Sequence, residues 1–373
     1  MSFQSIPIID LSKASDPNTK AEFLNELRYA LIEVGFFYLK NYESVGPSKE
    51  DFKDIARESA EFFNLPEKVK NECEMIHSPH FLGYTRLANE ITASQTDWRE
   101  QIDLGTELPA PKEGEPIYKN IEGPNLWPDS QYAPHFKPVI QNYISKMSTL
   151  STNVRKLVCE AIGLKPSALD SYFKPNQQAK LKIIAYPDTQ ELSSKSSAAL
   201  DDSPSTGQGV GPHRDSDLIT FIYQVTPHQN SLQVQNFQGE WITVKNIPGT
   251  LVVNAGQTLE AITSGVCKAT IHKVLIPEAG SGTRISVPFF QTIDLDARKT
   301  AVENIPQEIL DLKNKRDEKI KDWAVDIGFQ FIPDISKYPV GHAVFRNRIK
   351  SHQDVAAKWY PDILKEVLAE YTK

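Results

Sequence analysis

The sequence predicts a mainly β protein with flanking helices, whose core is a barrel or a double-sheet jelly roll. The first observation is a run of short segments between residues 181 and 291 that alternate in hydrophobicity and are separated by Gly, Pro, Asn and Gln turns. The second is that helical patterns precede and follow this run. So many short strands in succession favour a barrel or a jelly roll over a parallel sheet.

The N-terminal part predicts a strand, a helix and a second strand, in that order. Residues 6–10 alternate weakly, as a short strand does. Apolar residues then recur at helical spacing from Phe23 to Val34, and Gly35 ends the pattern. Residues 36–39 form an apolar run that is typical of a buried strand.

Two further helices and a long irregular region are expected before the strand run. Residues 49–63 and residues 137–162 have helical periodicity, and the second range carries one continuous apolar stripe that Gly163 closes. Residues 76–135 are rich in Pro, Gly, Asn and aromatic residues, which predicts long ordered loops.

From residue 181 the period changes to two, the repeat of a strand with one buried face. Residues 188–209 interrupt the run with six serines and almost no apolar residues, so a loop is expected there. The predicted strands are residues 181–186, 218–225, 231–237, 240–244, 250–254, 269–276 and 283–291.

The composition excludes several functional classes. The chain has 373 residues, of which 40% are hydrophobic and 24% charged, so it is neither disordered as a whole nor a disulfide scaffold. Its net charge of −7 disfavours nucleic acid as a partner, because a negative surface repels phosphate. No apolar run is long enough to span a membrane, and the N-terminus lacks a signal-peptide pattern. With only three, widely spaced cysteines, the sequence predicts a cytoplasmic protein.

The residues that carry chemistry begin with His213, Arg214 and Asp215, directly before an apolar strand. In extended backbone, residues two apart point to the same side, so His213 and Asp215 can reach one metal ion while Arg214 faces away. A second His-x-Asp sequence at residues 352–354 opens an apparent helix and has no histidine after it, so it is interpreted as structural.

Three residues further along the chain complete the pattern. His272 lies in an alternating strand, and Arg284 and Ser286 lie two apart on the next strand, on one face. Two imidazoles and one carboxylate that leave metal positions open form the facial triad of non-haem Fe(II) oxygenases. An arginine nearby can hold a carboxylate in a bidentate pair, with a serine hydroxyl adding a hydrogen bond.

Characteristic segments occur along nearly the whole chain. They are residues 6–11 (IPIIDL), 35–38 (GFFY), 62–66 (FFNLP), 97–100 (DWRE), 125–128 (NLWP), 209–215 (GVGPHRD), 247–254 (IPGTLVVN) and 284–290 (RISVPFF). Together they resemble the isopenicillin N synthase-like branch of the Fe(II)/2-oxoglutarate-dependent dioxygenases. Residues 351–355 (SHQDV) and 359–361 (WYP) resemble fungal members of that family.

The resemblance implies a double-stranded β-helix (jelly-roll) core with the long helix packed along it. It also implies one oxygenase domain over residues 1–373. The parts of that domain would be an N-terminal α/β and loop region (1–135), a backbone helix (136–175), the jelly-roll core with the Fe(II) and 2-oxoglutarate site (176–300) and a C-terminal helical extension (301–373).

The resemblance further implies which residues bind the metal and the co-substrates. His213, Asp215 and His272 would hold Fe(II), and O2 and 2-oxoglutarate would be the co-substrates. Ascorbate is a candidate additional cofactor. The distal carboxylate of 2-oxoglutarate would meet Arg284 and Ser286.

The resemblance also includes one further matching position, one departure from the family, and two candidate substrate contacts. Tyr186 corresponds to the family tyrosine that also touches 2-oxoglutarate, whereas Ile184 stands where the family commonly has Asn. Phe290 continues the Arg284 strand and is a candidate substrate contact, as is Tyr84 in a loop region of the kind that varies within the family.

The expected function is hydroxylation or desaturation of a small organic molecule, with release of succinate and CO2. A 2-oxoglutarate-independent iron oxidase of the same family shares these residues, and a non-catalytic small-molecule sensor could use the same scaffold. A zinc hydrolase would leave Arg284 unexplained. The expected partner is a small-molecule substrate, with neither nucleic acid nor membrane. The oligomeric state stays open, and a monomer is compatible with the sequence.

Overall fold

The computed structural model describes residues 2–92, 95–195, 207–298, 300–320 and 338–371. A larger sheet has the strand order β1-β2-β12-β9-β14-β7-β6-β3, a smaller sheet has the order β11-β10-β13-β8, and β4 pairs with β5. These strands are β1 Ile8–Asp10, β2 Phe36–Lys40, β3 Gly83–Thr85, β4 Glu90–Thr92, β5 Gln95–Asp97, β6 Glu100–Gly105, β7 Lys180–Tyr186, β8 Gln208–His213, β9 Ile219–Gln224, β10 Leu232–Gln235, β11 Trp241–Thr243, β12 Leu251–Ala255, β13 His272–Leu275 and β14 Arg284–Gln291.

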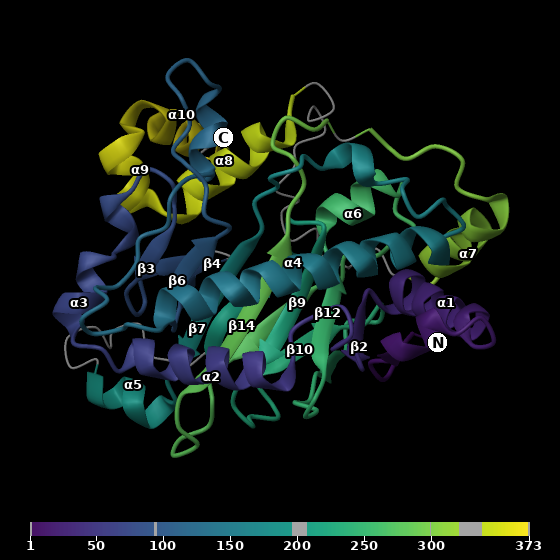
Figure 1. The fold of residues 1–373 in the computed structure, drawn as a ribbon, viewed down its shortest axis with the longest axis horizontal. Helices are drawn as coiled ribbons and strands as arrows, with labels where there is room; N and C mark the ends of the chain where they lie inside the picture. Colours follow the sequence, from purple (N-terminus) through teal and green to yellow (C-terminus); the bar gives the residue numbers. More distant parts are fainter. Residues whose placement is uncertain (1, 93–94, 196–206, 299, 321–337, 372–373) are drawn as a thin grey trace.

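Helices cover the larger sheet and both ends of the molecule (Figure 1). The long α4 and α2 cross one face of the larger sheet, and α8, α9 and α10 gather at one end of it. The prediction of a mainly β jelly-roll core with flanking helices and a long packed helix is confirmed. The helices are α1 Lys20–Tyr29, α2 Lys49–Phe63, α3 Glu67–Glu72, α4 Phe136–Ala161, α5 Thr189–Lys195, α6 Gln257–Ile262, α7 Gln307–Asp317, α8 Val340–Ser351, α9 Gln353–Trp359 and α10 Pro361–Tyr371.

The two faces of the larger sheet have different partners because side chains alternate along each strand. On β7, Leu181 and Ile183 lie in the buried cluster that also contains Met147 of α4. The intervening residues Ile184 and Tyr186 belong to a second cluster that includes residues of both sheets. Each fully buried side chain of this size stabilises the fold by about 1.5–3 kcal/mol. The apolar stripe of α4 therefore covers the outer face and leaves the inner face for the site.

The start of β2 depends on a glycine. After α1 the chain forms a π-helical turn, Ala30–Val34, and Gly35 follows it with φ of 75°. A Cβ atom at this position would lie 2.2 Å from the carbonyl oxygen of Lys268, so no other residue fits without moving backbone. The turn brings β2 into the sheet beside β12.

Residues 76–135 contain more regular structure than the predicted loops. Both β3 and β6 extend the larger sheet there, and β6 is buried along its whole length although its sequence is EQIDLG. Glu100 accepts a hydrogen bond from Lys70 at 3.0 Å, and Asp103 pairs with Lys182 and Arg348, each at 3.3 Å. Distant residues compensate these charges, so charged side chains can occupy buried positions of β6. The strand therefore shows little of the apolar alternation by which sequence reasoning finds strands.

The segment 188–209 also departs from the prediction of a loop. Its first part forms α5, whose first turn is held by Asp188: the Oδ1 atom accepts a hydrogen bond from the backbone N–H of Glu191 at 2.8 Å. Residues 196–206 lie outside the described residues, so the prediction for that part is not tested.

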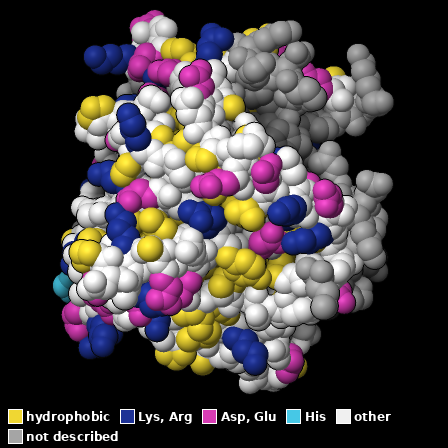
Figure 2. All heavy atoms as spheres, turned by 90° about the vertical axis from the view of Figure 1, so that its right-hand side faces the viewer, with side chains coloured by type: hydrophobic (Ala, Val, Ile, Leu, Met, Phe, Trp, Pro, Cys, Tyr) yellow, Lys and Arg dark blue, Asp and Glu magenta, His cyan; other side chains and the backbone are white. Residues whose placement is uncertain are grey.

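The surface at the α1 and α7 end of the molecule has mixed charge. On this face, Lys and Arg side chains are interspersed with Asp and Glu and with small apolar patches (Figure 2). No helix in the described ranges is long and apolar enough to cross a membrane.

Candidate active site

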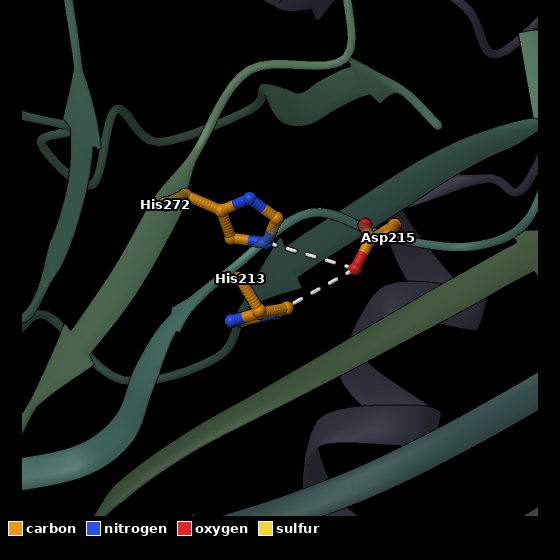
Figure 3. A group of neighbouring side chains, drawn as sticks. All are labelled: His213, Asp215 and His272. Carbon is orange, nitrogen blue, oxygen red and sulfur yellow. Dashed lines mark ion pairs between the residues drawn. The ribbon is translucent and has the colours of Figure 1, made fainter. Parts of the chain in front are cut away.

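The structure brings His213, Asp215 and His272 together at one end of the smaller sheet (Figure 3). His213 is the last residue of β8 and His272 the first of β13, and the two residues are direct partners in this antiparallel pair. Their ring centroids lie 4.2 Å apart. The Nε2 atom of each histidine lies 3.6 Å from Oδ1 of Asp215. The strand register therefore fixes the spacing of the two imidazoles.

Backbone carbonyls orient both imidazoles. Nδ1 of His213 lies 2.8 Å from the carbonyl oxygen of Gly211, and Nδ1 of His272 lies 3.3 Å from that of Thr270. A carbonyl oxygen only accepts, so each Nδ1 carries the proton and each Nε2 keeps its lone pair. Both Nε2 lone pairs are thus available to a ligand on the side of Asp215.

Asp215 is held on one oxygen and available on the other. Its Oδ2 atom accepts hydrogen bonds from Oγ1 of Thr220 at 2.6 Å and from Nδ2 of Asn254 at 2.8 Å. Oδ1 faces the two imidazoles. Two nitrogen lone pairs and one carboxylate oxygen therefore converge on one region.

The protonation states suit metal binding. Burial lowers the pKa of His213, and burial together with His213 lowers the pKa of His272 to about 4, against the attraction of Asp215. Although burial opposes it, the two imidazoles and the hydrogen bonds from Thr220 and Asn254 hold the pKa of Asp215 below its ordinary value. At neutral pH the rings are neutral and the carboxyl is ionised, which is the state that a metal ion needs.

One part of the sequence prediction for this site is wrong. The prediction has His213 and Asp215 on one side of an extended segment with Arg214 facing away. In the structure β8 ends at His213, so Asp215 reaches the site from the following loop, and Arg214 also lines the cavity. Sequence reasoning missed β8 as a strand because Gly209, Gly211 and Pro212 within it are typical of loops.

A buried arginine lies farther along the same cavity. Arg284 begins β14, is 2% exposed, and is paired in register with Tyr186 of β7. Its guanidinium donates to Oε1 of Gln224 at 3.3 Å and lies 3.5 Å from Oγ of Ser286. Burial lowers the pKa of Arg284. Within the described residues, Arg284 forms no ion pair with a carboxylate, so the site presents a buried cation without a counter-ion.

One cavity of about 460 Å³ joins these groups. Phe290 lines it, as does every residue named for the metal and for 2-oxoglutarate. Tyr84 does not: it packs against Phe62, and its hydroxyl donates to Oε2 of Glu100 at 2.7 Å. We therefore do not retain Tyr84 as a substrate contact.

The second His-x-Asp sequence lies apart from the three converging groups. His352 is 4% exposed at the junction of α8 and α9, and its Nε2 atom lies 3.8 Å from Oε1 of Glu90. Asp354 accepts a hydrogen bond from Asn89 at 3.1 Å. Both residues join the C-terminal helices to β4 and its neighbourhood, as the structural interpretation predicts.

Sequence reasoning missed several polar residues that hold the side chains of the site. Gln224, Thr220 and Asn254 support Arg284 and Asp215, and each lies on a strand that was predicted from its apolar pattern. A polar residue inside an apolar strand is the signal that could have identified them, because a buried polar group requires a partner. The charged residues at the far end of the cavity, which include Lys180, Asp217 and Arg348, were also missed.

Comparison with known proteins identifies relatives along the whole chain. Residues 6–130 match the family model of the N-terminal region of non-haem dioxygenases in morphine synthesis, and residues 186–293 match the 2OG-Fe(II) oxygenase superfamily. A 2-oxoglutarate-dependent dioxygenase of Dothideomycetidae sp. is 42% identical over 100% of this chain and 97% of that protein. A 2-oxoglutarate-dependent dioxygenase of Gibberella zeae is 35% identical over 97% of this chain and 93% of that protein.

More distant relatives share the fold. A homoarginine-6-hydroxylase of Glycine max is 32% identical over 81% of this chain and 88% of that protein. The crystal structure of a full-length Neurospora crassa protein in complex with alpha-KG has a TM-score of 0.68 at 24% identity, covering 92% of this chain and 95% of that one. The predicted resemblance to fungal members is confirmed, and the chain belongs to the 2-oxoglutarate-dependent Fe(II) dioxygenases of the isopenicillin N synthase-like family.

Proposed function

We propose that His213, Asp215 and His272 hold the Fe(II) of this dioxygenase. The observation that supports the proposal is the convergence of three donor atoms that have no other hydrogen-bond partner among the described residues, namely two Nε2 atoms and one Oδ1. Imidazole nitrogen and carboxylate oxygen are suitable ligands for Fe(II), and three ligands on one side leave positions for co-substrates. The donor set therefore fits the metal that the family uses.

Arg284, Ser286 and Tyr186 are proposed to bind 2-oxoglutarate. A guanidinium buried without a carboxylate is costly unless a ligand supplies one, and the planar fork of arginine matches a carboxylate in a bidentate pair. Ser286 lies beside the guanidinium, and the Tyr186 ring lies 5.2 Å from its Cζ atom. Ile184 lies next to Tyr186 on the inner face, so this position offers the co-substrate an apolar contact where the family commonly offers an amide.

The enzyme hydroxylates or desaturates a small organic molecule and converts 2-oxoglutarate and O2 to succinate and CO2. Iron, when bound, supplies the activation of O2. The residues of this chain position the reactants: Arg284 fixes one end of the keto acid, and the two sheets enclose the site. His272 is only 4% exposed, so the cavity wall on that side excludes water from the metal position.

The test of the metal assignment compares the two proposed histidine ligands with His352. His272→Ala and His213→Ala should each lose stoichiometric Fe(II), because each removes one of three ligands. His352→Ala is the matched control, since His352 is also 4% exposed and also precedes an aspartate by two positions. Iron is measured per folded chain, and folding is checked by circular dichroism. Equal iron loss in His352→Ala and His213→Ala would reject the assignment.

We also propose a reducing compartment, the cytosol, for this enzyme. Its cysteines Cys73, Cys159 and Cys267 are buried free thiols, as is usual where glutathione keeps thiols reduced. Fractionation of cells that express the chain would test this, and recovery of the enzyme in an organelle or in the medium would reject it.

A further inference from the structure

The cavity extends well beyond the positions assigned to iron and 2-oxoglutarate. Alternate residues of β7 line it in a row, from Tyr186 through Lys182 to Lys180. The neighbouring β14 runs beside this row, with Arg284 paired to Tyr186 and Phe290 paired to Lys180. Six residues of strand span about 20 Å at 3.3 Å each. Lys180 and Phe290 therefore mark the end of the cavity opposite to the guanidinium that receives the co-substrate.

Lys180 is a buried cation at this far end. Its side chain lines the cavity, and the residue is only 8% exposed. The Nζ atom donates to the carbonyl oxygen of Ile121 at 2.8 Å, and it forms no ion pair within the described residues. Burial, together with the positive charge of Arg348, lowers the pKa of Lys180 to about 7, so the ammonium and the neutral amine are both present near neutral pH and a bound carboxylate favours the ammonium. A lysine is rarely buried without a carboxylate, so this side chain requires an explanation.

Two other cations of the cavity wall, Lys182 and Arg348, already have a carboxylate partner. Lys182 and Arg348 each lie 3.3 Å from Oδ1 of Asp103, and Lys182 also lies 3.8 Å from Oε1 of Glu90. These ion pairs join β6, β7 and α8 and are parts of the wall. Lys180 differs from them because its charge faces the cavity without such a partner.

Asp217 presents the opposite charge to the same space. It lines the cavity after Asp215, and its carboxylate has no hydrogen bond or ion pair within the described residues. The charges of Asp217 and Lys180 interact electrostatically, yet the two side chains do not form an ion pair with each other. A cation and an anion that line one cavity and remain separate are suited to a ligand that carries both complementary charges.

We propose, on the basis of the function proposed above, that the substrate is a zwitterion whose carboxylate binds Lys180 and whose cationic group binds Asp217. An amino acid is the simplest molecule of this class. The cavity of about 460 Å³ includes the space proposed for iron and 2-oxoglutarate, so the remaining part suits a small molecule such as an amino acid.

The experiment compares the binding of free amino acids with that of derivatives that lack one of the two charges. The probes are the protein L-amino acids and L-ornithine, each with its primary amide, which lacks the carboxylate, and its Nα-acetyl form, which lacks the α-ammonium. Binding is measured as the rise in melting temperature of the protein with Fe(II) and 2-oxoglutarate in the absence of O2. Turnover is measured as succinate release in air. At least one free amino acid should bind and be turned over, with its amide binding about tenfold or more weakly.

Two variants assign each charge to its residue. Lys180→Met should weaken the free amino acid by about tenfold or more and leave the affinity of the amide unchanged, because the amide does not use the ammonium. Asp217→Asn should weaken the binding of the free amino acid by about tenfold or more and leave the affinity of its Nα-acetyl form unchanged, because that form lacks the α-ammonium. Lys182→Met is the matched control, since it removes a positive charge from the same strand and wall but from a residue that Asp103 already neutralises.

The outcomes separate this inference from the assignment of the co-substrate. If 2-oxoglutarate itself does not stabilise the iron-loaded protein, the proposed function fails. If 2-oxoglutarate stabilises it but no free amino acid binds, or the amides bind equally well, only the zwitterion is rejected. An equal loss in Lys180→Met and Lys182→Met would likewise reject Lys180 as the carboxylate-binding residue.

Discussion

At the scale of single residues, the site depends on side chains whose polar atoms are divided between support and function. Asp215 gives one oxygen to Thr220 and Asn254 and keeps the other for the site. The two histidines divide their ring nitrogens in the same way between a backbone carbonyl and the metal position. Residues that support metal ligands in this manner usually change metal affinity when they are removed.

Asn254→Ala should therefore weaken Fe(II) binding by about 10- to 100-fold, because Asp215 loses one of its two orienting hydrogen bonds. Asn254 is 1% exposed and touches no position proposed for substrate, so the effect should appear in the dissociation constant for iron. That constant is measured by titration of the apoprotein with Fe(II) without O2. Thr220→Val, which leaves the Asn254 bond in place, should show a loss of similar direction. Unchanged affinity in both variants would contradict this account of Asp215.

Arg284 allows a prediction about the co-substrate. Arg284→Ala should lower the affinity for 2-oxoglutarate by about 30- to 5000-fold. This corresponds to about 2–5 kcal/mol for removing one partner of a buried charge pair. Arg284→Lys keeps the charge but lacks the planar fork, so it should recover only part of the loss. Calorimetric titration of the iron-loaded protein without O2 gives both values. Full recovery with lysine would mean that charge alone holds the co-substrate, and no loss with alanine would reject the assignment.

At the scale of elements, regular apolar patterns predicted helices and strands correctly. A strand whose buried positions carry paired charges was not predicted. The predicted helices at 49–63 and 137–162 correspond to α2 and α4, because a single apolar stripe faces one sheet. The strand β6 escaped prediction because its buried Glu100 and Asp103 are neutralised by residues far away in the chain. The proposed metal ligands could be predicted from sequence because His213 and Asp215 are only two residues apart and His272 lies in an alternating strand. The charged end of the cavity, in contrast, is assembled from β7, the loop after β8, and α8.

The ion pairs of Asp103 on β6 should contribute to the free energy of unfolding, because they join β6 to β7 and α8. Asp103→Ala should destabilise the fold by about 3–5 kcal/mol, because it removes the buried carboxylate that Lys182 and Arg348, only 13% and 16% exposed, share. Glu50→Ala is the surface control: Glu50 pairs with Lys53 at 2.9 Å, but its side chain is 70% exposed, and such pairs contribute about 0–1 kcal/mol. Chemical denaturation measures both changes. Similar losses in the two variants would show that the Asp103 pairs are not important for stability.

At the scale of the whole molecule, the cavity is closed by parts of the chain that are distant in sequence. The positions proposed for the metal and the co-substrate lie between the two sheets, while α8 of the C-terminal group of helices contributes Val344 and Arg348 to the cavity wall. The binding of iron and 2-oxoglutarate should therefore be separable from the binding of substrate. A substitution on α8 can fill the far end without touching the sheets at the metal.

Val344→Phe should hinder the binding of substrate and leave the proposed iron and 2-oxoglutarate sites intact. Val344 is partly buried and lines the cavity, so the added ring atoms occupy space at the end where Lys180 lies. We expect the iron content and the dissociation constant for 2-oxoglutarate to stay within about twofold of the wild type, because none of the residues proposed for them lies on α8. Substrate-dependent succinate release should fall by about tenfold or more through a higher KM. Val344→Ala, which enlarges the same space, is the matched control and should retain co-substrate affinity while accepting larger substrates. If Val344→Phe weakens 2-oxoglutarate as much as it weakens substrate, the two ends of the cavity are not independent, and the division of the site along β7 and β14 is wrong.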